Sequence, residues 1–237
     1  MDLGWSSSSS GGGRRRSASP VSDEERDRDF GTGRRSKAEP WGKGVSGKQN
    51  KTFVDGTNRN RSVAYIFTDS QLRPVVQGEV ELPPGPVHMI INSTPGGTCR
   101  HVEEELLEFR WELEPDVVLV AAGTNNIGFG SERLGVACKQ FRGLLRSARR
   151  MTPLVLASSI APRLDRKGRL VDEYNDAFYK ICNEEGATWL DITDSFPMTE
   201  RNLWARDGLH ISECTGLPRL LRVWHRRMVM TMWPGGS

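Results

Sequence analysis

From residue 62 onward, short runs of apolar and β-branched residues alternate with longer stretches in which apolar residues recur every three or four positions. A short, continuous apolar run is typical of a buried strand, and the longer spacing is typical of an amphipathic helix. The predicted strands are residues 63–67, 87–92, 117–122, 154–159 and 188–192. The predicted helices are residues 98–113, 131–150, 172–185 and 218–230. Strands and helices therefore alternate along this part of the chain.

This alternation predicts the fold class. Strands that are joined by helical crossovers pair in parallel, with helices on both faces of the sheet. The third predicted strand, 117–122, is apolar at every position, as expected for a strand covered on both faces. We therefore expect a three-layer α/β/α domain over residues 62–237, with a flavodoxin-like, five-stranded parallel sheet.

Residues 1–61 have a different composition, rich in Ser, Gly, Arg and Asp. They contain 13 Lys and Arg against 8 Asp and Glu, a charge of +5, whereas the rest of the chain carries −2. A segment with so few apolar residues cannot bury enough surface to fold alone, so we expect a disordered basic tail. Its arginines at 14–16 and 34–35 suggest weak RNA or polyanion binding, or a nuclear signal, although a solvated tail is the simpler interpretation.

Cysteine use and hydropathy indicate a reduced, intracellular protein. The four cysteines are scattered and form no Cys-x-x-Cys pair, which argues against a disulfide framework. No apolar run is long enough to span a bilayer, and the N-terminus lacks the apolar core of a signal peptide. We expect the cytoplasm or the nucleus, with no transmembrane segment.

Polar residues follow the ends of several predicted strands. Ser70 comes after the first strand, Gly96 after the second, and Asn125 after the third, while Asp207 and His210 precede the last helix. The carboxyl ends of parallel strands meet at one edge of a sheet, which is where such sheets bind ligands. A serine at this edge can act as a nucleophile if a base and oxyanion donors reach it.

Taken together and in this order, these motifs resemble the SGNH, or GDSL-type, hydrolase family. The stretches 96–102, 114–120 and 123–126 are especially similar to the intracellular platelet-activating-factor acetylhydrolase catalytic subunits. Related domains also occur in retrotransposon-encoded proteins, joined to nucleic-acid-binding segments. The resemblance covers about residues 62–230 and implies the SGNH hydrolase fold.

The resemblance also implies a role for each residue. Ser70 matches the nucleophile, His210 the general base, and Asp207 the carboxylate that orients the base. The backbone N–H groups of Ser70 and Gly96, with the side-chain amide of Asn125, match the oxyanion hole. The implied activity is hydrolysis of a small-molecule carboxylic ester, with no cofactor and no metal ion. Neither the particular ester nor the oligomeric state has a signal in the sequence.

Two positions depart from the family pattern. Thr68 stands where the family usually has the Gly of its Gly-Asp-Ser motif, and Gly97 stands where Asp often follows the oxyanion glycine. Neither departure removes a catalytic group. The second leaves open whether Gly96 or Gly97 provides the oxyanion donor.

Each of these residues also has a simpler structural explanation. Ser70 could cap a helix, Asn125 could cap its own loop, and Asp207 could belong only to a turn. Trp204 and Phe196 could line an acyl pocket, but packing in the core is at least as good an explanation.

Two further motifs are weak. Residues 42–49 nearly match a phosphate-binding loop, but they lack its final Ser or Thr and follow no strand. Cys99, His101, His210 and Cys214 do not have the spacing of a zinc site. Two function classes remain: a serine esterase, or a catalytically silent, retroelement-derived SGNH-fold module that binds a partner and uses its basic tail on nucleic acid.

Overall fold

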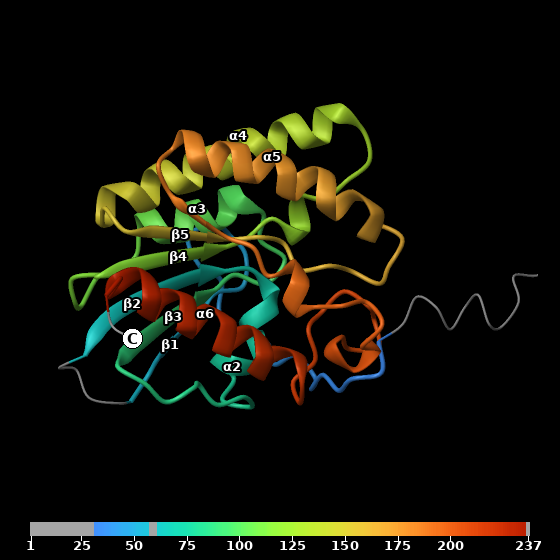
Figure 1. Ribbon diagram of the computed structural model, residues 1–237, viewed down its shortest axis with the longest axis horizontal. Helices are drawn as coiled ribbons and strands as arrows, with labels where there is room; N and C mark the ends of the chain where they lie inside the picture. Colours follow the sequence, from blue (N-terminus) through green and yellow to red (C-terminus); the bar gives the residue numbers. More distant parts are fainter. Residues whose placement is uncertain (1–30, 57–60, 236–237) are drawn as a thin grey trace, which may run out of the picture.

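The computed structural model describes residues 31–56 and 61–235, which form a sheet between two layers of helices (Figure 1). The strands are β1 (Lys51–Val54), β2 (Ser62–Thr68), β3 (Val87–Ser93), β4 (Val117–Ala121), β5 (Val155–Ser158) and β6 (Thr188–Leu190). The last five lie within two residues of the predicted strands at each end. The apolar runs were therefore a reliable guide to the strands.

The sheet has the strand order β1-β3-β2-β4-β5-β6. Strands β2 to β6 pair in parallel, in the order that is typical of flavodoxin-like sheets. Strand β1 adds an antiparallel edge next to β3 that the sequence did not predict. The expected α/β fold class is confirmed, with one strand more than expected.

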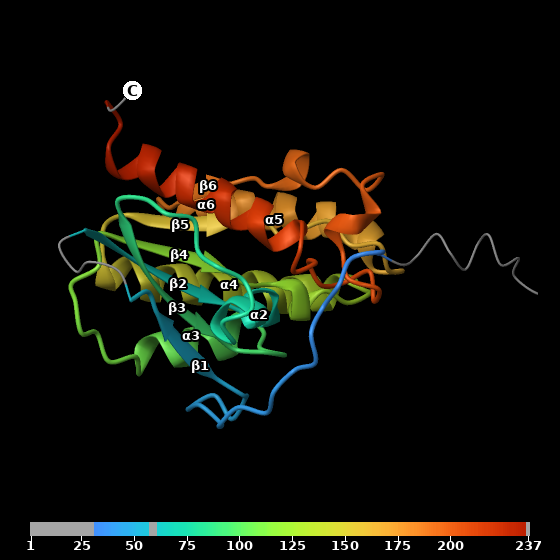
Figure 2. The ribbon, with the colours of Figure 1, turned by 90° about the horizontal axis from the view of Figure 1, so that it is seen from below.

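Helices cover both faces of the sheet (Figures 1 and 2). One face carries α3 (Cys99–Leu107), α4 (Ser131–Met151) and α5 (Val171–Glu184), and the other carries α2 (Arg73–Val76) and α6 (Gly216–Met232). On the first face, the rings of Phe141 and Phe178 stack with centroids 4.1 Å apart. On the second, α6 buries its apolar residues at helical spacing: Leu217, Leu220, Leu221, Trp224 and Met228. None of the described helices is both long and apolar enough to cross a membrane.

Helix α3 ends earlier than predicted, at Leu107 rather than near residue 113. Beyond it, Phe109 and Trp111 leave the helix and pack against Tyr65 of β2, with ring centroids 5.6 and 4.6 Å away. The Tyr65 hydroxyl donates a hydrogen bond of 2.9 Å to the Leu113 carbonyl. The apolar spacing continued past the helix because these side chains fill the core from an irregular segment.

Residues 31–50, which we call the strap, and β1 form part of the domain, although we expected residues 1–61 to be a disordered tail. The Gly33 N–H donates to the Trp204 carbonyl at 2.8 Å, and the Ser46 hydroxyl donates to Glu105 at 2.6 Å. The composition argument failed here because the segment is held by main-chain and polar contacts to an existing fold. The domain therefore begins before residue 62, and residues 1–30 and 57–60 of the expected tail lie outside the described residues.

The segment that nearly matches a phosphate loop, 42–49, forms a tight turn within the strap. The Gly44 N–H donates to the Lys48 carbonyl at 2.8 Å, and Gly47 has a positive φ of 74°. Strand β1 follows this turn, so the segment does not lead into a helix whose N-terminus could hold a phosphate.

Candidate active site

Ser70 lies directly after β2, near the middle of the sheet and at its carboxyl edge. It opens the short helix η2 (Ser70–Leu72), whose cap is the preceding Asp69: the Asp69 carboxylate accepts from the Gln71 N–H at 3.1 Å. Asp69 is fully buried, and burial raises its pKa to about 6. The Ser70 side chain is thus not needed as the helix cap and is available for other contacts.

Three of the predicted residues form one line of hydrogen bonds. The Ser70 Oγ lies 3.1 Å from the His210 Nε2, and the His210 Nδ1 lies 2.6 Å from the Asp207 Oδ2. The Asp207 Oδ1 also accepts from the backbone N–H groups of Leu209 and His210, at 3.0 and 2.9 Å. Asp207 does belong to a turn, in which Gly208 has a positive φ of 62°. This turn brings the Asp207 carboxylate to the Nδ1 of the His210 ring.

The surroundings set the charges of this pair. Burial lowers the pKa of His210 below its ordinary value of 6.5; the hydrogen bond to Asp207 opposes this, and the positive charges of Arg35 and Arg163 add to it. Burial alone would raise the pKa of Asp207, but hydrogen bonds donated by His210 outweigh that effect and hold it well below its usual range. At neutral pH, Asp207 is therefore ionised and His210 is neutral, the states a carboxylate and a general base need.

Asn125 and the glycine turn lie side by side at the same edge. The Asn125 Nδ2 donates to the Gly97 carbonyl at 2.9 Å. The Gly97 N–H donates to Thr94 in a turn at 2.9 Å, whereas no hydrogen bond from the Gly96 N–H is found among the described residues. Gly96 has a positive φ of 72°, a conformation that suits glycine. Of the two glycines, Gly96 is therefore the one with an uncommitted N–H.

Thr68, the departure from the family's glycine, fits the end of β2. Its hydroxyl donates to the Ala121 carbonyl of β4 at 3.0 Å, and its own carbonyl accepts from the Thr94 N–H at 2.9 Å. The threonine thereby joins the strand that carries Ser70 to the loops after β3 and β4.

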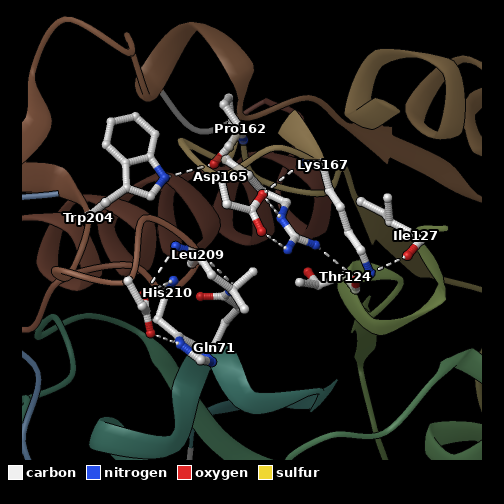
Figure 3. Close-up of polar contacts among 11 residues, drawn as sticks. Gln71, Thr124, Ile127, Pro162, Asp165, Lys167, Trp204, Leu209 and His210 are labelled. Carbon is white, nitrogen blue, oxygen red and sulfur yellow. Dashed lines mark hydrogen bonds and ion pairs between the residues drawn. The ribbon is translucent and has the colours of Figure 1, made fainter. Parts of the chain in front are cut away.

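The loop after β5 holds the Asn125 loop in place through two cations. Lys167 donates a hydrogen bond of 2.9 Å to the Ile127 carbonyl (Figure 3). The Arg163 Nη1 donates one of 3.2 Å to the Thr124 carbonyl. Arg163 is buried, and its charge is balanced by Asp165, 2.5 Å away. Sequence reasoning missed these residues, because a cation in a loop carries no sign of where its side chain reaches.

Gln71 connects the nucleophile's helix to the histidine loop (Figure 3). Its Nε2 donates to the Leu209 carbonyl at 3.3 Å, and its Oε1 accepts from the Ile211 N–H at 3.1 Å. These bonds on both sides of His210 fix the loop relative to Ser70.

The remaining candidates have structural roles. Trp204 is buried, its ring contacts Phe196 at 6.1 Å between centroids, and its indole N–H donates to the Pro162 carbonyl at 2.7 Å (Figure 3). Trp204 and Phe196 therefore belong to the core. His101 accepts from the Thr98 N–H at 3.1 Å and so caps α3. In the described part of the chain, no three His, Cys, Asp or Glu side chains are placed to share a metal ion.

Arg35 of the strap is a site residue that sequence reasoning assigned to the tail. Its Nη2 donates to the Ser70 carbonyl at 2.9 Å. The strap reaches this position because the Ser36 hydroxyl bonds to Glu213 at 2.8 Å and Gly33 pairs with Ala205. A cation from a segment 35 positions upstream thus contacts the backbone of the candidate nucleophile.

Comparison with known proteins identifies the family. The model of the GDSL-like lipase/acylhydrolase family matches residues 82–213, more than half of the chain. The chain belongs to this family. The resemblance to SGNH, or GDSL-type, hydrolases is thereby confirmed. The matched part of this GDSL-like acylhydrolase contains Gly96, Asn125, Asp207 and His210, while Ser70 and the strap precede it.

Solved structures share the fold. A GDSL-like lipase from Bacteroides thetaiotaomicron has a TM-score of 0.56 at 12% identity, covering 74% of this chain and 91% of its own. A catalytic mutant of an acetylxylan esterase from Geobacillus stearothermophilus has a TM-score of 0.55 at 18% identity, with coverages of 73% and 95%. A structure from Streptococcus pneumonia, named as a candidate platelet activating factor, has a TM-score of 0.57 at 17% identity, covering 71% of this chain and 84% of its own. No curated protein matches the chain by sequence.

Proposed function

We propose that this GDSL-like acylhydrolase cleaves carboxylic esters with Ser70 as nucleophile, His210 as general base and Asp207 as the orienting carboxylate. The observation that carries the proposal is the line of hydrogen bonds from Ser70 through His210 to Asp207, with distances of 3.1 and 2.6 Å, at the carboxyl edge of the sheet. Serine needs an adjacent base to become a nucleophile, and the base needs a partner that selects its tautomer.

In this mechanism, the Ser70 Oγ attacks the ester carbonyl and its proton moves to the His210 Nε2. The oxyanion that forms accepts hydrogen bonds from the N–H groups of Ser70 and Gly96 and from the Asn125 side chain. His210 then protonates the leaving alcohol, and a water molecule, activated by the same histidine, hydrolyses the acyl-enzyme. Asp207 keeps the proton of neutral His210 on Nδ1 and stabilises the imidazolium.

The oxyanion donors are supported by their placement. Ser70 is the first residue of η2, so its N–H has no acceptor within that helix. The Asn125 amide can donate two hydrogen bonds, and the bond to the Gly97 carbonyl uses one of them. Preorganised donors of this kind are each worth about 3–4 kcal/mol in acyl transfer.

A fluorophosphonate probe tests the proposal, because it reacts with an activated serine. We expect labelling at Ser70, mapped by peptide mass spectrometry, and its loss in Ser70→Ala and His210→Ala. The two variants should each lose nearly all ester hydrolysis, and the double variant should be little worse, because nucleophile and base act as one unit. Ser131→Ala, at the exposed start of α4, is the matched control. Labelling at another serine, or a Ser70→Ala protein with full activity, would refute the mechanism.

Nothing among the described residues favours the alternative of a catalytically silent binding module. Polyanion binding by the basic tail and a cytoplasmic or nuclear location stay predictions. For residues 1–30, these predictions lie outside the described part of the chain.

A further inference from the structure

A cavity of about 690 Å³ lies between the strap and the loop that precedes His210. It is lined by residues 32–36 and 205–207, two segments that pair at Gly33 and Ala205. Figure 2 shows the strap running beside the loops that precede α6. The volume is in the range of small-molecule sites.

The cavity is strongly cationic. Arg34, Arg35 and Arg206 line it, and Asp207 is the one acidic residue of its lining. The Asp207 carboxylate is already engaged by His210 and by two backbone N–H groups. Three cations and one carboxylate line the cavity, so its lining carries a net positive charge.

The nearest other carboxylate, Glu213, is also engaged. It accepts hydrogen bonds from the backbone N–H and the hydroxyl of Ser36. The Arg34 Nε lies 3.9 Å from it, at the limit of an ion pair, and the Arg34 side chain is 75% exposed. An exposed ion pair of this kind contributes little to stability, so the Arg34 guanidinium can turn toward a ligand at a small cost in free energy.

Arg35 lacks a full set of partners. Its Nη2 donates to the Ser70 carbonyl, whereas its Nη1 is buried and has no hydrogen-bond partner among the described residues. An unpaired, buried N–H group is costly, and burial lowers the pKa of Arg35 to about 10. An anion in the cavity would counter this cost by supplying negative charge beside the guanidinium.

The position of the cavity indicates which part of an ester it would hold. In the proposed mechanism, His210 gives its proton to the leaving alcohol, so the alcohol lies on the His210 side of the Ser70 Oγ. Asp207, which bonds to the far nitrogen of His210, lines the cavity. Arg35, which donates to the Ser70 carbonyl, lines it as well. These two residues place the cavity within reach of an alcohol group bound beside Ser70 and His210.

Resting on the proposed function, we propose that this cavity binds an anionic group, a carboxylate or a phosphate, on the alcohol part of the ester. Guanidinium groups form the strongest hydrogen bonds of any cation with these two groups, because they can donate in pairs. The strap precedes residues 82–213, the part that matches the family model, so this subsite is built in part by a segment outside the match.

Three acetyl esters with matched phenol leaving groups test the proposal on the full chain: 4-acetoxybenzoate, 4-acetoxyphenyl phosphate and the neutral 4-acetoxybenzamide. We expect kcat/KM to be about ten- to a hundred-fold higher for one or both anionic esters than for the neutral one, as charge-assisted hydrogen bonds would give. The better of the two anionic esters identifies the group. The phenyl monoester of succinate places a negative charge on the acyl side, and the phenyl ester of succinamate is its neutral counterpart. The kcat/KM values of these two esters should differ little.

Variants locate the effect. Arg206→Gln and Arg34→Gln should each reduce the preference for the anionic ester several-fold, and the double variant should reduce it further, leaving only the part that Arg35 supplies. Arg150→Gln, an exposed position at the end of α4, should leave the preference as in wild type. Thermal unfolding checks that each variant is folded.

The outcomes separate the two proposals. Equal rates on anionic and neutral esters, in a wild type that hydrolyses both, would overturn the anionic subsite and leave the esterase proposal standing. An equal preference for charge on the acyl side, or a preference that is undiminished in the Arg34/Arg206 double variant, would also overturn it. Absence of both fluorophosphonate labelling and hydrolysis of any ester would instead overturn the proposed function.

Discussion

His210 is surrounded by groups that act on its charge in opposite directions. Burial, Arg35 and Arg163 disfavour the imidazolium, and Asp207 favours it, with a net lowering of the pKa below 6.5. In the proposed mechanism, only the neutral imidazole can take the Ser70 proton, so we expect activity to rise as the pH rises through this pKa. A lowered pKa therefore extends activity toward acid pH.

The pH profile of kcat/KM on a neutral acetyl ester tests this reasoning. We expect the acid limb to have a midpoint below 6.5, the ordinary pKa of histidine. Arg35→Gln removes a positive charge near His210. Because the loss of this charge stabilises the imidazolium, the midpoint should move to higher pH. Arg150→Gln should leave it unchanged. A wild-type midpoint above 6.5, or no shift in the folded Arg35→Gln protein, would contradict this electrostatic account.

Asn125 and its neighbour Asn126 have different partners, which separates rate from stability. The Asn126 side chain accepts from the Cys99 N–H of α3 at 2.9 Å and donates to Gln140 of α4 at 2.7 Å, so it ties its loop to two helices. The Asn125 amide donates one bond to the Gly97 carbonyl, and its second N–H is the one that we propose for the oxyanion.

We expect Asn125→Ala to lower kcat by about 10²–10³, as for other lost oxyanion donors. Its melting temperature should change less than that of Asn126→Ala, because Asn126 makes two side-chain bonds to helices α3 and α4. Steady-state kinetics on an acetyl ester and thermal unfolding give the two readings. Unchanged turnover in folded Asn125→Ala would mean that this side chain only closes its loop.

At the scale of elements, the turn between β4 and the Asn125 loop depends on Gly123. This glycine has a positive φ of 133°, and a Cβ there would lie 2.7 Å from the Phe178 ring of α5. The close approach lets α5 pack directly behind the loop that carries Asn125. The helix layer and the site are thus coupled at one residue.

Gly123→Ala should therefore lower both stability and turnover, because either Phe178 or the loop must move. Gly135→Ala is the matched control: it lies on the exposed face of α4, with open space around its Cβ. In a helix interior, alanine is favoured over glycine by about 0.8–1 kcal/mol, so this variant should melt at a slightly higher temperature with unchanged turnover. Equal melting temperatures and turnover in the two variants would show that the close contact between Gly123 and Phe178 does not constrain the fold or the site.

At the scale of the whole molecule, the strap connects the sheet edge to the catalytic edge. It begins against the loop at Trp204, passes Ser70 and Glu213, and ends in β1 beside β3 (Figure 2). Removing the strap together with β1 would expose the edge of β3 and take Arg35 from the site.

Limited proteolysis of the full chain should therefore give a stable fragment that begins near residue 31, rather than near residue 62 as the composition suggests. The reason is that main-chain hydrogen bonds hold the strap from Thr32 onward. Mass spectrometry of the fragment gives its first residue. Accumulation of an active fragment that begins after residue 56 would show that the strap is dispensable.

The sequence by itself determined the parallel sheet and the residues that gather at its edge. Strand 117–122 and its neighbours are recognisable because burial between two helix layers requires apolar residues at nearly every position. The residues after such strands must meet at one edge, so Ser70 and Asn125 could be assigned to a common site before any contact was known. His210 and Asp207 were added because they precede the last helix, and their roles came from the family resemblance.

The tertiary structure alone decided the end of α3, the fate of the strap, and the reach of Arg35 and Arg163. Phe109 follows the helical spacing of α3 but packs outside the helix, because the ring of Tyr65 offers it a better contact. The strap has too few apolar residues to fold alone, yet it is held by hydrogen bonds to groups that exist only once the sheet has formed. Periodicity and composition describe local preference, whereas these features depend on partners 35 or more positions away along the chain.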